Sequence, residues 1–188
     1  MKVIIDTSSL LSLVRYYLPF DKDTKLYDFI KKEFENGNLI LIDAVHEECE
    51  YTSKGIVLKR LDYLKDRSFK KANKIPFKTN DILPPSTKKF YNLLNDNFRT
   101  PLSRRLNDAE FEERKKEFLE SADARMIILA LNVKNEKENV LIITEESEIA
   151  NDHKAFKKIP AICKILDIKV MTLPELLETY NGIDFEFK

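Results

Sequence analysis

The chain has 188 residues, of which 43% are hydrophobic and 34% charged, and its formal net charge is zero. This length and hydrophobic content are typical of one folded domain with a real core, and they argue against a disordered chain. The two cysteines, Cys49 and Cys163, and the two histidines, His46 and His153, lie at no spacing typical of a zinc site. We therefore expect reduced, structural thiols in a cytoplasmic protein.

The charges are unevenly distributed along the chain. Residues 51–105 contain 14 Lys and Arg against 4 Asp and Glu, whereas residues 1–50 contain 6 against 10 and residues 106–188 contain 12 against 18. A basic segment between acidic flanks is typical of a nucleic-acid contact surface, although a solvated basic insertion explains it as well. We hypothesise that Lys70, Lys71 and Lys74 contact a nucleic-acid backbone.

The first quarter of the chain predicts two buried strands joined by helices. Residues 3–5 are bulky and apolar, which predicts a strand covered on both faces, and Asp6 follows directly. This run is too short for a signal peptide or a membrane span. Ser8 or Ser9 is expected to cap a helix reaching Val14, although Asp6 itself is an alternative cap. Residues 24–35 predict a helix, residues 39–42 a second strand that ends before Asp43, and residues from 45 a further helix.

The rest of the chain repeats this arrangement after a long elaboration. Residues 52–118 predict a basic, mostly helical elaboration, with helices over 53–64 and from Asn107 onward. Ser121 is expected to cap a helix whose first turn contains Asp123, on the same face as core residues. Residues 140–144 predict a third strand, which Glu145, Glu146 and then Glu148 follow. Residues 168–172 predict a fourth strand and residues 174–180 a short helix.

Together these elements predict the fold class and a cluster of acids. Apolar strands alternating with helices indicate a single three-layer α/β/α domain over residues 1–188, with a central parallel sheet of four to five strands. Acids that follow parallel strands meet at one edge of the sheet, where their mutual repulsion favours binding of Mg²⁺ or Mn²⁺. The chemistry typical of such a site is metal-assisted hydrolysis of a phosphodiester.

Four short motifs, in this order, resemble those of the PIN-domain nucleases. They are a strand ending in Asp-Thr-Ser at Asp6, the Val-His-Glu-Glu sequence that ends at Glu48, an Ala-Asp-Ala sequence around Asp123, and Thr-Glu-Glu ending at Glu146. The resemblance covers about residues 1–50 and 119–172. It implies a PIN-like fold and a metal-dependent endoribonuclease. Because the family includes the toxins of toxin–antitoxin pairs, it also implies that this protein could be such a toxin. The expected partner is single-stranded or structured RNA, and an antitoxin protein or a second copy of the chain in a homodimer are further candidates. No membrane association is expected.

The resemblance also implies roles for individual residues. Asp6 and Asp123 would bind Mg²⁺ or Mn²⁺ directly, and Glu48 and Glu146 would complete the catalytic, metal-binding set directly or through water. Ser8 and Thr144 are candidates to bind a water or a phosphate oxygen. The family more usually has Asp where Glu146 stands, so Glu145 or Glu148 could take the place of Glu146.

Two other functions are considered. A non-catalytic PIN-like scaffold would bind RNA or a protein without cutting, but such a scaffold has no evident need for four acids. A haloacid-dehalogenase-like phosphatase would use Asp6 as a nucleophile with a second Asp two positions later, where this chain has Ser8. We therefore favour the nuclease.

Overall fold

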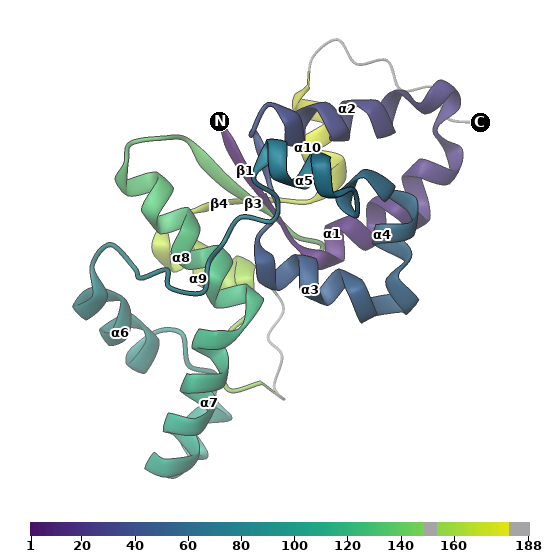
Figure 1. Cartoon of the computed structure of the whole chain (residues 1–188). Coiled ribbons are helices and arrows are strands. Elements are labelled where there is room, and N and C mark those ends of the chain that lie inside the picture. The colour runs from purple at the N-terminus through teal and green to yellow at the C-terminus, as the bar shows by residue number, and fades with distance from the viewer. Residues whose placement is uncertain (149–153, 181–188) are drawn as a thin grey trace.

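The computed structural model describes residues 1–148 and 154–180 and contains a four-stranded parallel sheet with the strand order β2-β1-β3-β4 (Figure 1). The parallel register places Val3 beside both Leu39 and Leu141, and Leu141 beside Lys169. The predicted α/β class with a central parallel sheet is confirmed. The strands are β1 Lys2–Ile5, β2 Leu39–Ile40, β3 Val140–Ile143 and β4 Lys169–Met171.

Helices cover both faces of the sheet. The steps from β1 to β2 and from β2 to β3 run in opposite directions across the sheet, so right-handed connections place their helices on opposite faces. At the end of α10, Tyr180 makes an edge-to-face ring contact with Phe29 of α2 at 4.7 Å. The helices are α1 Thr7–Ser12, α2 Lys25–Glu35, α3 Asp43–Tyr51, α4 Ile56–Arg60, α5 Arg67–Asn73, α6 Thr87–Asp96, α7 Asp108–Glu120, α8 Ala122–Asn135, α9 Ile159–Leu166 and α10 Leu173–Thr179.

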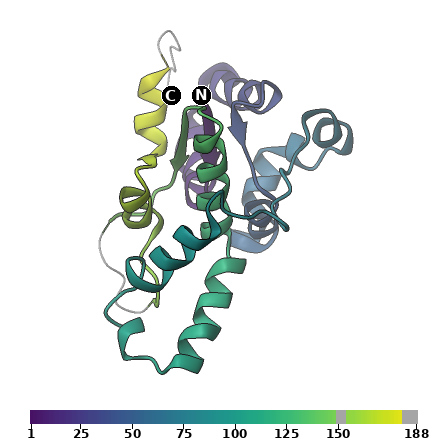
Figure 2. The ribbon, with the colours of Figure 1, turned by 90° about the vertical axis from the view of Figure 1, so that its left-hand side faces the viewer.

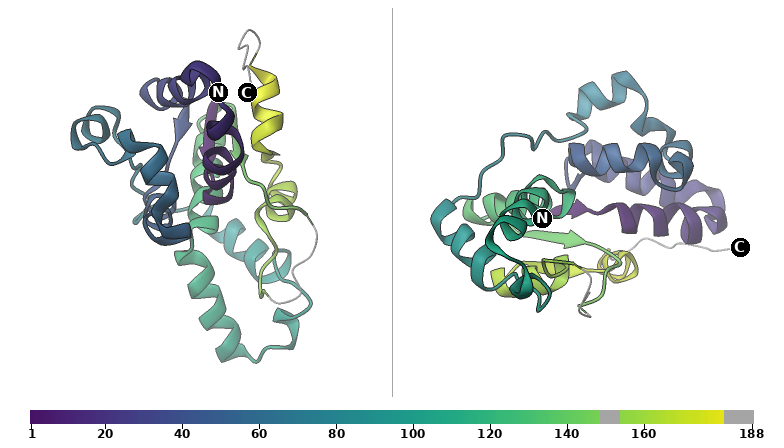
Figure 3. Two further views of the ribbon diagram at one scale, coloured as in Figure 1. Left: turned by 90° about the vertical axis from the view of Figure 1, so that its right-hand side faces the viewer. Right: turned by 90° about the horizontal axis from the view of Figure 1, so that it is seen from below.

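The central strands are buried on both faces, as their apolar sequences predict. Ile4 and Ile5 of β1 and Ile142 and Ile143 of β3 have no exposed surface. In Figure 3, α10 and α5 lie on opposite sides of the molecule with the strands between them. No helix in the two described ranges is long and apolar enough to cross a membrane.

Several predicted boundaries are wrong for identifiable reasons. The N-cap of α1 is Asp6 and neither Ser8 nor Ser9, and after Ser12 the chain continues as a π-helical turn, Leu13–Tyr17. Strand β2 is two residues long instead of four, because the backbone after it pairs with a loop. In that pairing, Phe77 N–H donates to the carbonyl of Leu41 at 2.8 Å.

The helix predicted over 53–64 is interrupted, and only Ile56–Arg60 forms α4. Ser53, Lys54 and Gly55 all have positive φ, at 53°, 59° and 69°. A Cβ atom on Gly55 would lie 2.9 Å from the carbonyl oxygen of Glu50, so only glycine fits this turn without a shift of the backbone. This tight turn explains why the helical spacing of apolar residues predicted a longer helix than α4.

The segment 52–118 contains α4, α5, α6 and most of α7, and two backbone bridges connect it to the sheet region. Ile42 pairs with Phe77 in parallel, and Arg99 pairs with Phe156 in the antiparallel sense. Figures 1 and 2 show α6 and α7 projecting away from the sheet. Phe90 and Phe98 are buried with their ring centroids 5.8 Å apart, as expected for a small core of the elaboration, whereas Phe77 is 43% exposed.

Candidate functional site

Asp6 lies at the carboxyl end of the central strand β1 and accepts hydrogen bonds on both carboxylate oxygens. The Thr7 N–H donates to Oδ1 at 2.7 Å, which makes Asp6 the cap of α1. The hydroxyls of Ser8 and Thr144 donate to Oδ2 at 2.6 and 2.8 Å. The two residues expected to bind a water or a phosphate oxygen are thus directed at Asp6 and fix its orientation.

Glu48, on α3, lies beside the start of α1 because a threonine connects the two. The hydroxyl of Thr7 donates to Oε2 of Glu48 at 2.5 Å, and Glu48 is half-buried. The sequence did not identify Thr7 as a contact of Glu48. The three consecutive hydroxyl residues after Asp6 were a usable signal, because successive side chains at a helix start point in different directions and can contact different acids.

Asp123 lies in the first turn of α8, where Ser121 caps the helix by accepting the Ala124 N–H at 3.3 Å. No residue within 1–148 or 154–180 donates a hydrogen bond to the Asp123 carboxylate. Its pKa is raised to about 7, first by burial and then by three nearby negative charges, while the positive charge of Lys154 lowers it. The three charges that raise this pKa belong to Glu146, Asp6 and Glu48.

Among the three acids after β3, Glu146 has the strongest electrostatic effect on Asp123. Its carboxylate accepts the Ile159 N–H at 3.3 Å, at the start of α9. Glu145 instead accepts the Leu173 N–H at 2.9 Å and the hydroxyl of Ser9 at 3.0 Å. Exposed Glu148 pairs with Lys164 at 3.0 Å. Both alternatives to Glu146 therefore already have other partners.

Asp43, the acid that follows β2, does not belong to this group. It is 2% exposed and accepts the N–H of Thr79 at 3.0 Å, the hydroxyl of Thr79, and the N–H of Ala44 at 3.1 Å. Burial raises the pKa of Asp43, but these hydrogen bonds and the nearby Arg125 outweigh that effect and lower it. Asp43 thus fastens the 75–83 loop to α3.

The four predicted acids are electrostatically coupled without forming a tight cluster. Across residues 1–148 and 154–180, no group of three or more His, Cys, Asp or Glu side chains is arranged so that it could hold a metal ion. A charge can shift a pKa from further away than the length of a metal–oxygen bond. The acids can therefore raise the pKa of Asp123 without lying close enough to share a metal ion. Any shared cation would require the carboxylates to move closer together.

Comparison with protein families gives one match. Residues 88–182 match the model of a family described as a domain of unknown function, DUF4411. The chain belongs to this family. Neither the curated proteins nor the solved structures include a match to the chain. The DUF4411 range contains Asp123 and Glu146, whereas Asp6 and Glu48 precede it.

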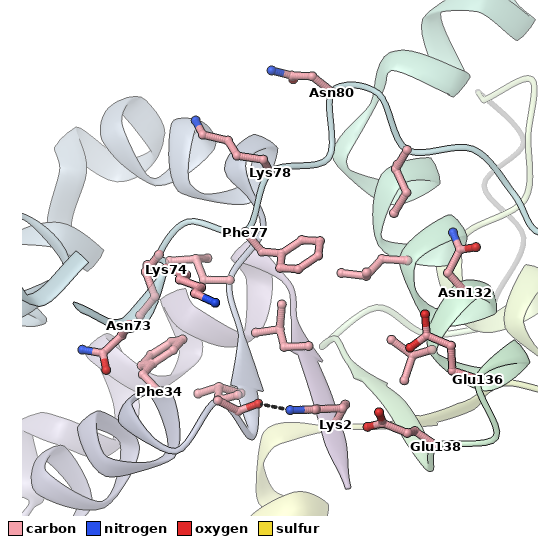
Figure 4. Close-up of a pocket in the computed structure, with 18 of the residues that line it drawn as sticks. Lys2, Phe34, Asn73, Lys74, Phe77, Lys78, Asn80, Asn132, Glu136 and Glu138 are labelled. Atoms are coloured by element: carbon pink, nitrogen blue, oxygen red, sulfur yellow. Dashed lines mark hydrogen bonds between the residues drawn. The ribbon is translucent and has the colours of Figure 1, made fainter. Parts of the chain in front are cut away.

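Cavity size alone does not locate the acids of this DUF4411 protein. A cavity of about 940 Å³ lies beside β2, where Figure 4 shows Phe77, Lys74 and Asn132 around it and Lys2 bonded to the carbonyl of Gly37. None of the four acids lines it. A smaller cavity of about 380 Å³ is lined by Asp123 and by Lys154, a basic residue that sequence reasoning missed.

Proposed function

We propose that this DUF4411 protein is a metal-dependent endoribonuclease with a PIN-like fold. The observation that supports it is the environment of Asp123, whose pKa is about 7 because burial and three other carboxylates disfavour its charge. No donor in the described part of the chain offsets that cost. A half-buried carboxylate without a donor, beside other carboxylates at the edge of a parallel sheet, is the environment that a divalent cation stabilises.

The side chains present fit Mg²⁺ or Mn²⁺ in their chemistry, since both ions prefer carboxylate oxygens. Asp6 and Asp123 would bind the cation directly, and Glu48 and Glu146 directly or through water. When bound, such an ion supplies an activated water and neutralises charge on the scissile phosphate.

The chain itself orients these acids. Ser8 and Thr144 hold one oxygen of Asp6, and Thr7 holds one oxygen of Glu48, so both carboxylates are positioned before any substrate binds. Each carboxylate oxygen has a second lone pair, which leaves acceptor capacity toward the centre of the site. Lys154 places a positive charge near Asp123, where it would attract a phosphate.

The proposal is tested by incubating RNA, both unstructured and hairpin, with EDTA, Mg²⁺ or Mn²⁺. We expect cleavage only with metal, and none with Asp6→Asn. Asp23→Asn is a matched control, because Asp23 is exposed and its φ of 62° is tolerated by asparagine. Mn²⁺ should also raise the Tm of the wild type and of Asp23→Asn but not of Asp6→Asn. RNA binding without cleavage in any metal would instead favour the non-catalytic scaffold.

The phosphatase alternative is less compatible with the surroundings of Asp6. A phosphatase of this kind needs a second Asp two positions after its nucleophile, whereas that position is Ser8, whose hydroxyl donates to Oδ2 of Asp6. Incubation with a phosphomonoester followed by mass spectrometry distinguishes the two, since only the phosphatase forms a phosphoaspartate on Asp6.

We further propose that the basic segment contributes to RNA affinity. Lys70 and Lys71 lie on α5 and Lys74 follows it, and none of the three lines the 380 Å³ cavity at Asp123. Reversing all three charges should weaken RNA binding and flatten its salt dependence, while the Mn²⁺-induced rise in Tm stays unchanged. Unchanged affinity and unchanged activity would eliminate this contact.

The biological setting proposed is a toxin–antitoxin pair. If the protein is a toxin, its expression should arrest growth in a manner that requires Asp6. Coexpression of a small neighbouring reading frame should restore growth and yield a complex on size-exclusion chromatography. Growth arrest that persists with Asp6→Asn would contradict a ribonuclease toxin.

A further inference from the structure

The cavity of about 380 Å³ beside Asp123, here named the Asp123 pocket, has the features of a nucleotide site. Its volume falls within the range of about 300–1,000 Å³ that is usual for small-molecule sites. One wall is apolar, and the rings of Phe118 and Phe156 pack there with centroids 4.7 Å apart and planes inclined by 31°. Leu102 and Leu106, both half-buried, extend that wall.

Interactions within the protein hold the walls of the Asp123 pocket in place. The Thr100 N–H donates to the carbonyl of Ala155 at 3.0 Å, and the Lys157 N–H donates to the carbonyl of Phe98 at 2.8 Å. These two bonds join the elaboration to the segment that precedes α9. Because the walls are fixed from both sides, the pocket is present without a ligand, and little ordering has to accompany binding.

The rim of the Asp123 pocket carries three cations, Arg114, Lys154 and Lys157, and one acid, Glu117. Arg114 is exposed and pairs with Glu117 at 2.8 Å, and the ammonium of Lys157 donates to the carbonyl of Asn97 at 2.7 Å. Lys154 is exposed, and its charge reaches Asp123. An apolar wall with cations at its rim suits a base, which has an apolar face, together with its phosphate.

We propose that the Asp123 pocket binds the nucleotide next to the phosphodiester that is cut, with its base against Phe118 and Leu106 and its phosphate near Lys154. This inference rests on the proposed nuclease function, since Asp123 lines both the pocket and the acidic site. The wall offers ring and methyl contacts, so stacking determines the fit and tolerates different bases. The pocket would therefore set the position of the strand and contribute affinity.

The test compares variants in the Asp123 pocket with matched controls. Leu106→Trp narrows the pocket, and Leu83→Trp makes the same change at a residue that is 68% exposed and does not line it. Lys154→Ala removes a rim cation, and Lys116→Ala removes an exposed cation of α7 that does not line the pocket. Affinity is measured by fluorescence anisotropy with a labelled oligoribonucleotide in EDTA, so that it is independent of cleavage.

We expect Leu106→Trp to weaken oligoribonucleotide binding by roughly 10-fold or more, and to raise KM in Mn²⁺ by a similar factor. Lys154→Ala should weaken binding less and reduce the slope of log affinity against log salt by about one. Both control variants should bind like the wild type. Equal affinity of the pocket variants and their controls would overturn the proposal.

The two proposals fail in different ways. If the wild type cleaves RNA with Mn²⁺ and the pocket variants bind and cleave normally, the pocket assignment is wrong and the nuclease stands. If no metal supports cleavage, the nuclease is wrong and with it the position next to a cut bond, and the binding comparison decides only whether the pocket binds a nucleotide. Should Leu106→Trp misfold, titration of wild type with 5′-mononucleotides followed by NMR replaces it. Shifts confined to the signals of Phe118 and Leu106 support the pocket, and unchanged signals contradict it.

Discussion

Asp43 and Asp123 both occur at the start of a helix, yet their surroundings are opposite. Asp43 accepts hydrogen bonds from Thr79 and Ala44, and its pKa is lowered although it is 2% exposed. Asp123 has no donor in the described part of the chain, and its pKa is raised to about 7. Burial alone therefore does not mark a functional acid. The absence of donors distinguishes an acid available to a cation from an acid that stabilises the fold.

The largest expected contrast is in catalysis. Asp123→Asn should lower metal-dependent RNA cleavage by about 100-fold or more, because an amide is a poorer ligand for a hard cation. Asp43→Asn should retain the wild-type rate per folded molecule when assayed below its Tm. The measurement is initial cleavage rate in Mn²⁺, with the folded fraction determined by circular dichroism. Equal losses in both variants would remove the distinction between these acids.

The second contrast is in stability. Asp43→Asn should lower the free energy of unfolding by about 3 kcal/mol, because an NH2 group would replace one of the two acceptor oxygens and leave at least one donor of Thr79 unpaired. Urea denaturation measures this loss. A double-mutant cycle with Thr79→Val tests the cause, since a coupling energy near zero would show that Thr79 is not the partner that matters.

A third contrast concerns pH. The pKa of Asp123 lies above its value in the unfolded chain, so the folded wild type retains a proton that the unfolded chain releases. The contribution of Asp123 to the free energy of unfolding should therefore fall as the pH rises from about 4 to about 7. Asp123→Asn removes this loss and should unfold at a higher Tm than the wild type at pH 8 in EDTA, with little difference at pH 4. A lower Tm for the variant at pH 8 would contradict the assigned environment.

The smallest expected effect concerns the two thiols beside the acids. Cys49 and Cys163 are fully buried, and the pKa of each is raised to about 12, first by burial and then by nearby carboxylates. Native protein should therefore react with iodoacetamide only after unfolding, as mass spectrometry can show. Replacing both by Ser should leave the metal-dependent activity intact. Rapid alkylation of the folded protein would argue against these surroundings.

The sequence predicted the layers of the fold better than it predicted hydrogen bonds between distant segments. Residues 3–5 and 140–143 are recognisable as strands because bulky apolar side chains suit burial on both faces. Asp43 and Asp123 are alike in sequence, since each opens a helix. What separates them is Thr79, a residue 36 positions from Asp43 that only the folded chain brings into contact with it. Lys154 was missed for the same reason.

The position of Asp6 on the central strand has a consequence for how the site could assemble. Its backbone N–H donates to the carbonyl of Ile143 at 3.0 Å, and its side chain is held by Ser8 and Thr144. Asp6 is therefore the immobile reference point of the acidic group. Asp123 lacks such restraints and lies directly after the junction of α7 and α8. Any convergence around a cation would thus be a movement of the Asp123 side chain toward Asp6, with the sheet as the fixed part of the site.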